Sequence, residues 1–233
     1  MVRYGVRSTR RPASQVPSPS PIETFVPFGG RLCLDLANTV NGRLTDAPDD
    51  LLAHGADLAA FGHKMGLLSA ADAARLADVL AAEPQVASAC LARAVALRET
   101  LFSVFHAVAV GGQPSPAWTA DLIRAHGQSV SDTHLVREAA TGSWAWEART
   151  DLNPPRLGWL LFPVTRSALD LLTSPADLSR LKRCAGADRG CGGLFVDDSR
   201  NAIRRWCSMG DCGSRAKMRR LYARRRAGHS APA

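Results

Sequence analysis

The chain has 233 residues, of which 46% are hydrophobic and 21% charged, a composition typical of a soluble globular protein. Apolar runs such as Leu157 to Leu161 end well short of the roughly 18 residues of a membrane span, which argues against an integral membrane protein. No apolar signal-peptide core precedes Phe25, so we expect a cytoplasmic protein.

The formal net charge of +8 is unevenly distributed along the chain. Residues 178–226 contain fourteen Lys and Arg and four Asp, a net charge of +10, whereas residues 21–177 carry −6. The positive charge is therefore concentrated in one C-terminal segment, as binding to a phosphate backbone requires. Residues 1–24 hold four arginines among Ser and Pro, and we expect a disordered basic tail there; an arm that binds nucleic acid is the alternative.

A helix-rich domain is expected over residues 25–175. Its first part shows helical spacing of apolar residues in four segments, 31–40, 51–65, 69–82 and 86–110. The first segment also alternates as a short strand would, but its apolar residues fit one helical face and we favour a helix. Ser69 suits the N-cap of the third helix, and the fourth has the widest apolar stripe, including Leu97, Leu101 and Phe105.

A fifth helix is predicted from Trp118 to about Gly127, and the alternation over residues 133–149 predicts a β-hairpin. A last helix over about 157–173 should be interrupted near Pro163, because proline breaks the hydrogen-bond ladder. Beyond it, Ser174 and Pro175 are suited to begin a short helix that runs to Arg183.

Four late cysteines form two close pairs with the spacing Cys184-x6-Cys191-x15-Cys207-x4-Cys212. Without an export signal, paired thiols indicate metal ligands rather than disulfides. Thiolate sulfur is soft enough to bind zinc tightly, and four such ligands complete a tetrahedron, which predicts one structural zinc ion with no catalytic position. Cys33 and Cys90 lie among apolar residues and are expected to be ordinary buried thiols.

The residues around these cysteines predict a treble-clef-like finger over residues 178–226. Residues 194–197 and 203–207 are expected to form two strands joined by a turn, and a helix should follow from Gly210 to about Arg226. Cys212 would then lie at a helix N-terminus, where the helix dipole favours a thiolate. The segment has few apolar residues, so metal binding has to supply its stability. Residues 227–233 are expected to be a disordered C-terminus.

The closing helix combines a narrow apolar stripe with many cations. We expect Met218, Leu221 and Tyr222 to pack on the hairpin. A solvated charged face is the alternative for the cations, but their density without acidic i,i+4 partners favours nucleic-acid binding. The candidate contacts are Arg200, Arg204, Arg205, Arg215, Lys217, Arg219, Arg220 and Arg224.

An enzyme is a weaker hypothesis for the N-terminal domain. The candidates Asp35, Asn38, His54 and His63 match no nucleophile, metal or phosphate-binding spacing, so we predict no catalytic residue. Asp35 and Asn38 are expected to bind backbone groups, and the histidines to be surface or capping residues. Two alternatives stay open: a small-molecule effector bound near Asp35, and a finger that serves as a protein-interaction module.

Several of these segments resemble one known family. The matching stretches are Cys191–Arg200, Arg204–Met209, Cys212–Lys217 and Leu32–Val40, and together they resemble the CGNR zinc-finger proteins, which have an N-terminal ABATE domain. This chain has Ser214 where the motif Cys-Gly-Asn-Arg has asparagine. The resemblance implies a mainly α protein, namely a bacterial DNA-binding transcription regulator whose N-terminal domain is sensing or regulatory. It favours DNA over RNA as the partner, which the residues by themselves leave open.

Overall fold

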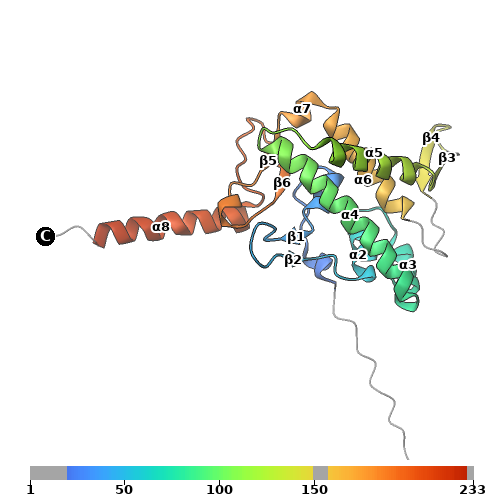
Figure 1. The fold of residues 1–233 in the computed structure, drawn as a ribbon, viewed down its shortest axis with the longest axis horizontal. Coiled ribbons are helices and arrows are strands. Elements are labelled where there is room, and N and C mark those ends of the chain that lie inside the picture. The colour runs from blue at the N-terminus through green and yellow to red at the C-terminus, as the bar shows by residue number, and fades with distance from the viewer. Residues whose placement is uncertain (1–19, 149–156, 230–233) are drawn as a thin grey trace, which may run out of the picture.

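The computed structural model describes residues 20–148 and 157–229, and Figure 1 shows their arrangement. The helices are α1 (Leu32–Ala37), α2 (Gly55–Lys64), α3 (Ala70–Ala82), α4 (Pro84–Ala109), α5 (Pro116–Val130), α6 (Gly158–Leu172), α7 (Pro175–Leu178) and α8 (Ser214–His229). Two short 3-10 helices, η1 (Pro21–Thr24) and η2 (Ala187–Arg189), and one short π-helix, η3 (Met209–Gly213), are also present. The strands form three antiparallel pairs: β1 (Val40–Asn41) with β2 (Asp49–Asp50), β3 (Thr133–Arg137) with β4 (Trp144–Ala148), and β5 (Leu181–Arg183) with β6 (Leu194–Val196). No helix in these ranges is long and apolar enough to cross a membrane.

The predicted helices of the N-terminal part form, with shifted ends. The side chain of Ser69 accepts a hydrogen bond from the Asp72 N–H and caps α3, as predicted. Helix α4 begins with Pro84 at its first turn and buries Leu97, Leu101 and Phe105 along one face. The predicted hairpin also forms, since β3 pairs with β4.

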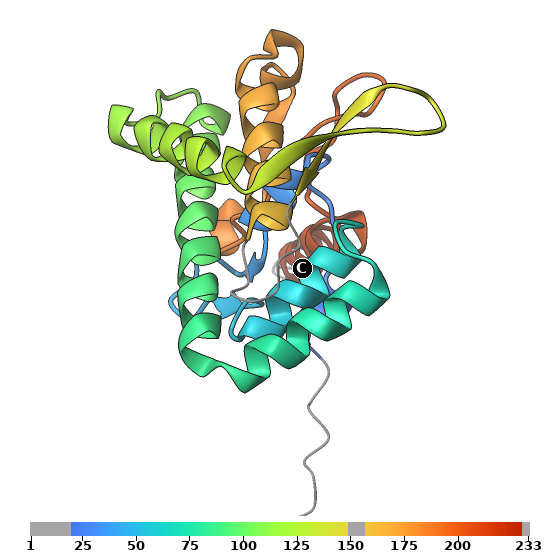
Figure 2. The same ribbon diagram turned by 90° about the vertical axis from the view of Figure 1, so that its right-hand side faces the viewer.

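Helix α1 lies at the centre of the core. Its residues Cys33, Leu34, Leu36 and Ala37 have no exposed surface, and it packs against α4, α6 and β6. Figure 2 shows the long α4 along one side of the domain, with α2 and α3 at its lower end. The prediction of a helix over a strand for this segment is therefore confirmed. Tertiary packing on several sides stabilises this short helix.

One predicted helix end and one predicted helix break are wrong. Helix α5 passes Gly127 and ends at Val130, and α6 continues through Pro163 without a break. Proline removes one hydrogen bond, but α6 buries residues on both sides of it, among them Leu161 and Val164. Packing therefore maintains a helix that local propensity disfavours.

The connection after α6 also differs from the prediction. Ser174 caps α7, with its side chain accepting from the Asp177 N–H, but the helix ends at Leu178 instead of continuing to Arg183. Residues 181–183 are strand β5, and their partner is β6, with Leu181 opposite Val196. The predicted pairing of residues 194–197 with residues 203–207 is therefore wrong, because β6 pairs with the segment before the first cysteine. The treble-clef-like hairpin is thus built from β5 and β6.

Strand β6 joins the C-terminal segment to the helical core. Leu194 and Val196 have no exposed surface and belong to the main core with Leu181, whereas Phe195 faces the opposite way and packs against the cysteines. The Val196 N–H also donates to the Gly29 carbonyl at 2.9 Å. The finger and the N-terminal helices consequently share one core through this strand.

Both ends of the described chain are more ordered than predicted. Residues 1–19 of the expected basic tail lie outside the described residues, but Ile22 in η1 is fully buried, and the Ser20 hydroxyl donates to Asp57 at 2.6 Å. At the other end α8 continues to His229, and only residues 230–233 of the expected disordered C-terminus are undescribed. Figure 1 shows α8 projecting away from the body, and Figure 2 shows it end-on.

Candidate metal centre and basic helix

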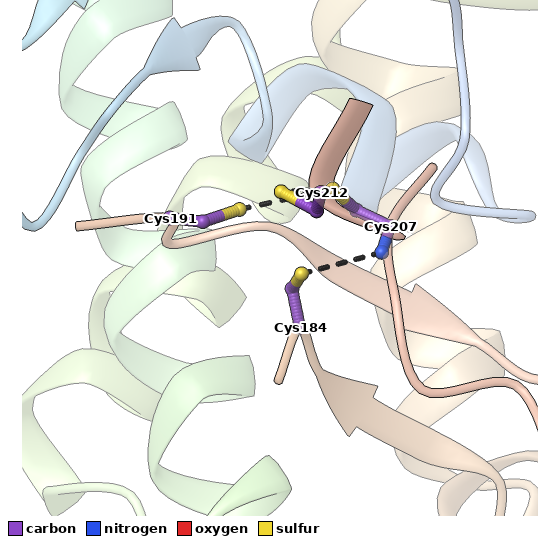
Figure 3. A group of neighbouring side chains, drawn as sticks. All are labelled: Cys184, Cys191, Cys207 and Cys212. Carbon is purple, nitrogen blue, oxygen red and sulfur yellow. Dashed lines mark hydrogen bonds between the residues drawn. The ribbon is translucent and has the colours of Figure 1, made fainter. Parts of the chain in front are cut away.

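The four late cysteines come together at one point. Their Sγ atoms all lie within 4.8 Å of one another, with 3.7 Å between Cys191 and Cys207 and 3.6 Å between Cys207 and Cys212 (Figure 3). A zinc ion bound to four sulfurs at about 2.3 Å has sulfurs separated by about 3.8 Å, the edge of a regular tetrahedron. The observed spacing therefore fits a four-coordinate zinc ion.

Backbone turns bring the first two cysteines to the cluster. Cys184 follows β5, and the chain reverses through η2 and Gly190, whose φ of 85° is favourable for glycine. The Sγ of Cys184 accepts hydrogen bonds from the N–H groups of Gly186 at 3.4 Å and Cys207 at 3.3 Å. These two donors stabilise a thiolate at Cys184.

The last cysteine lies where η3 leads into α8. The Ser208 side chain accepts from the Asp211 N–H at 3.3 Å and caps this turn, so Cys212 lies at a helix start as predicted. The Ser214 hydroxyl, in the place of the family's asparagine, donates to the Met209 carbonyl at 3.0 Å. The serine thus fastens the first turn of α8 to η3.

Close packing of the four thiols shifts their pKa values in different directions. Hydrogen bonds from Cys191 and Cys207 hold the pKa of Cys184 well below its usual value, and the contact with Cys184 raises the pKa of Cys207. Burial raises the pKa of Cys212. One thiolate therefore forms readily while further negative charge is repelled. A divalent cation offsets that repulsion, so the chemistry of the donor set also fits zinc.

Helix α8 is strongly cationic. It contains seven Lys and Arg and no acidic residue. Among the predicted contacts, Arg200, Arg205, Arg215, Lys217, Arg220 and Arg224 are exposed and Arg219 is half-buried. Arg215 pairs with Asp211 at 2.7 Å, one turn earlier. Its charge is thus partly offset.

Arg204 differs from the other predicted contacts. Its guanidinium donates to the carbonyls of Phe28, Trp206 and Cys207 at 2.7 to 3.1 Å, and lies 4.1 Å from the centre of the Phe195 ring. These contacts hold the loop before Cys207 against the N-terminal domain. The structure therefore gives Arg204 an internal bracing role, and its contact with nucleic acid stays a prediction.

The predicted apolar stripe of α8 does not pack on the hairpin. Met218, Leu221 and Tyr222 are 44%, 40% and 55% exposed, so this expectation is wrong. The physical reason is that α8 leaves the body after its first turns, where Ala216 is buried. These three side chains are consequently available on the projecting helix.

The polar residues of α1 hold backbone groups, as expected. Asp35 is 5% exposed, and its Oδ1 accepts from the N–H groups of Phe28 at 3.0 Å and Gly29 at 2.8 Å. The pKa of Asp35 is raised overall, because the effect of burial exceeds the lowering by these two hydrogen bonds. These backbone donors enclose the Asp35 carboxylate itself, and the small-molecule effector considered near this motif stays a prediction. Asn38 forms two hydrogen bonds with the backbone of Leu194.

The remaining candidates of the N-terminal domain also take structural positions. His54 is the exposed N-cap of α2, and His63 is an exposed residue of its last turn. Cys33 and Cys90 are buried, as expected, and burial raises the pKa of Cys33 to about 12.

One structural residue of the finger, Asp197, was missed in the sequence. Asp197 follows β6 and is fully buried, and its Oδ2 accepts from the Lys182 ammonium at 2.7 Å and the Arg204 N–H at 2.8 Å. Its Oδ1 accepts from the N–H and the hydroxyl of Ser199. The Asp-x-Ser spacing is a turn signal that indicates such a carboxylate.

Comparison with known families agrees with both parts of this structure. Residues 30–175 match ABATE, described as "Putative stress-induced transcription regulator", and residues 180–225 match the CGNR zinc finger. A comparison with curated proteins finds no match. The ABATE match covers more than half of the chain, and the cysteine cluster fits the single structural zinc of a CGNR finger. The chain therefore belongs to the ABATE family, with a C-terminal CGNR zinc finger.

Proposed function

We propose that this protein is a zinc-dependent, DNA-binding transcription regulator of the cytoplasm. Cys184, Cys191, Cys207 and Cys212 hold one zinc ion, which links β5, the turn through η2, the loop before Cys207 and the start of α8. Residues 178–226 form the DNA-binding finger and residues 25–175 the regulatory domain. The zinc has no open position and acts by fixing the direction of α8.

The observation that carries this proposal is the projecting helix. Seven cations without an acidic residue repel one another in isolation, and a phosphate backbone relieves this repulsion. A helix of 16 residues is about 24 Å long, and the major groove of B-DNA is about 12 Å wide and admits an α-helix. The major groove of A-form RNA is too narrow for side-chain readout, which favours DNA.

The side chains of α8 and of the loop before Cys207 have two different roles in DNA binding. We assign phosphate contacts to Arg200, Arg205, Arg215, Lys217, Arg219, Arg220 and Arg224. Met218, Leu221 and Tyr222, left uncovered by the fold, can contact thymine methyl groups in the groove. Arg204 contributes indirectly, through the loop that it braces.

Equilibrium binding of the zinc-loaded full chain to duplex DNA at several salt concentrations tests the proposal. If several phosphates are contacted, log affinity falls with log salt with a slope of about −0.9 per contact. The double variant Arg219→Ala/Arg220→Ala should reduce the magnitude of that slope by about 2 while keeping its zinc. Arg124→Ala, an exposed arginine of α5, is the matched control and should leave the slope unchanged.

Two results would count against DNA as the partner. A flat salt dependence would exclude a phosphate contact surface and would favour a protein-docking finger. Tighter binding to single-stranded or duplex RNA than to duplex DNA, measured at the same salt, would replace DNA by RNA. Selection of bound sequences from random DNA and RNA pools, with and without chelator, separates these partners and yields any sequence preference.

A further inference from the structure

A cavity of about 700 Å³ lies between the N-terminal domain and the zinc finger. This volume falls within the range of about 300 to 1,000 Å³ that is usual for small-molecule sites, and such sites favour domain interfaces. Cys191, Cys207 and Cys212 lie on its finger side. The cavity therefore borders both the metal centre and the base of α8.

The N-terminal domain supplies an apolar wall. Phe25, Val26, Phe28, Val40 and Leu51 line this side of the cavity, together with four polar residues, Thr24, Asn38, Asn41 and Thr45. Val26 is 74% exposed, although it lies beside the buried Phe25. An apolar wall of this kind offers nothing to a phosphate backbone but accommodates the hydrocarbon body of a small molecule.

The finger supplies a cationic wall. Arg189, Arg215 and Arg219 line the cavity, with Asp211 as the acidic side chain among the lining residues. Asp211 is engaged by Arg215 at 2.7 Å. Among the described residues, the Arg219 guanidinium has no hydrogen-bond or ion-pair partner. Arg219 thus offers a guanidinium group to an anionic ligand on the finger side of the cavity.

We propose that this cavity binds a small amphipathic organic anion. Its carboxylate or phosphate group lies against Arg215 and Arg219, and its apolar body lies against Phe28 and Val40. Arginine binds both kinds of anionic group through charge-assisted hydrogen bonds, and the apolar wall rejects a fully hydrated anion. The predicted site is distinct from Asp35, whose carboxylate is enclosed by backbone donors.

The position of the cationic wall gives this ligand a regulatory effect. Arg215 and Arg219 belong to α8, so one ligand would occupy two of the cations assigned to DNA. Ligand and DNA should then weaken each other's binding by the same factor, because coupling between two sites is reciprocal. This regulatory step depends on the proposed DNA-binding function, whereas ligand binding to the cavity does not.

The probe for the cavity is 1-anilinonaphthalene-8-sulfonate, a fluorescent anion with an apolar body, added to the zinc-loaded full chain. We expect one equivalent to bind with enhanced fluorescence, and Arg219→Ala to weaken binding roughly tenfold, the typical effect of a lost charge-assisted hydrogen bond. Arg220→Ala, a neighbouring cation that does not line the cavity, should bind as the wild type does. Neutral N-phenyl-1-naphthylamine should bind less tightly than the anion.

A second pair of variants tests the apolar wall. Val26→Glu places a carboxylate at the rim and should weaken binding of the anionic probe severalfold, without a folding penalty because Val26 is exposed. Val110→Glu, at an exposed position of similar type at the end of α4, is the control and should have no effect. Equal probe affinity in wild type, Arg219→Ala and Val26→Glu would overturn the proposed site.

Adding duplex DNA separates this inference from the proposed function. Mutual weakening of probe and DNA binding supports both. Arg219-dependent probe binding without DNA binding retains the cavity as a ligand site and rejects the DNA-binding function. DNA binding without Arg219-dependent probe binding rejects the ligand site alone.

Discussion

The side-chain amide of Asn38 forms two hydrogen bonds with the backbone of Leu194. Its Nδ2 donates to the Leu194 carbonyl at 2.8 Å, and its Oδ1 accepts from the Leu194 N–H at 2.9 Å. Asn38 follows α1 in the N-terminal domain, whereas Leu194 is the first residue of β6 in the finger. The contact joins residues 156 positions apart and is buried. It therefore ties the two parts of the chain at the strand that carries Phe195 to the cysteines.

Replacing Asn38 by alanine should destabilise the whole chain. The substitution leaves one buried N–H and one buried carbonyl of Leu194 without partners, at an expected cost of about 2 to 4 kcal/mol. Urea denaturation of the zinc-loaded protein measures this cost. Asn41→Ala, an exposed asparagine nearby, should lose less than about 0.5 kcal/mol. Equal losses in both variants would contradict a special role for Asn38.

Local features of the fold could be predicted from the sequence, whereas contacts between distant segments, such as that of Asn38 with Leu194, could not. The α4 stripe, the Ser69 cap and the cysteine spacing are local patterns, and all three have the expected structural counterparts. The pairing of β5 with β6 depends on a core shared by distant segments, and a strand of three residues has almost no periodic signal. Local propensity was also outweighed at Pro163, where packing preserves the helix.

In the candidate site, the sequence predicted the cysteines but not the direction of α8. Metal ligands obey strict spacing and chemistry, so they are visible in one sequence. The apolar stripe of Met218, Leu221 and Tyr222 led to a prediction of packing on the hairpin. The prediction failed because an apolar stripe does not specify the surface that it contacts. The sequence also gave no sign of the bracing role of Arg204, because nothing local distinguishes it from the neighbouring arginines. Its partners are carbonyl groups, which any sequence supplies.

Removing one thiolate should release the metal. Cys212→Ser replaces a soft ligand by a hydroxyl, and we expect less than about half an equivalent of zinc per chain after purification without chelator. Because β6 belongs to the main core, loss of zinc should also lower the melting temperature of the whole protein. Cys90→Ala is the control and should keep one equivalent. Full zinc content in Cys212→Ser would contradict a four-cysteine site.

Arg204 should contribute to folding stability and zinc retention, whereas Arg220 should contribute to DNA binding. Arg204→Ala removes three hydrogen bonds to carbonyls and the contact with Phe195, so it should lower stability by about 1 to 3 kcal/mol and weaken zinc retention under chelator competition. Arg220→Ala should change neither but should reduce the magnitude of the salt slope of DNA binding by about 1. An unchanged melting temperature in Arg204→Ala would refute its bracing role.

Stability should depend on pH through the buried Arg98. Its guanidinium forms a bidentate pair with Asp50 at 2.5 and 2.7 Å. Burial by itself would raise the pKa of Asp50, but hydrogen bonds from Arg98 lower it overall. Because the folded pKa lies below the unfolded value of about 4, the contribution of this pair is complete above that pH and declines as pH falls further.

The variant Asp50→Asn isolates this contribution. It should be less stable than the wild type by about 1 to 2 kcal/mol at pH 7, since the half-exposed carboxylate is partly screened by solvent. The difference should narrow as pH falls below about 4, because the wild-type carboxylate then becomes protonated. Paired denaturation curves measure the difference, and loss of zinc in acid affects both proteins alike. A difference that widens in acid would contradict the assigned sign.

Substitution of Leu221 should weaken DNA binding without affecting folding. Its side chain is 40% exposed on the projecting helix, so Leu221→Ala should change the free energy of unfolding by less than about 0.5 kcal/mol. Leu194→Ala, at a fully buried leucine of β6, should cost about 2 to 5 kcal/mol. If the apolar stripe contacts bases in the groove, Leu221→Ala should nevertheless weaken DNA binding severalfold while leaving its salt slope intact, because no phosphate contact is lost. A large loss of stability would instead show that the stripe packs within the protein, and α8 could not then lie in the groove as proposed.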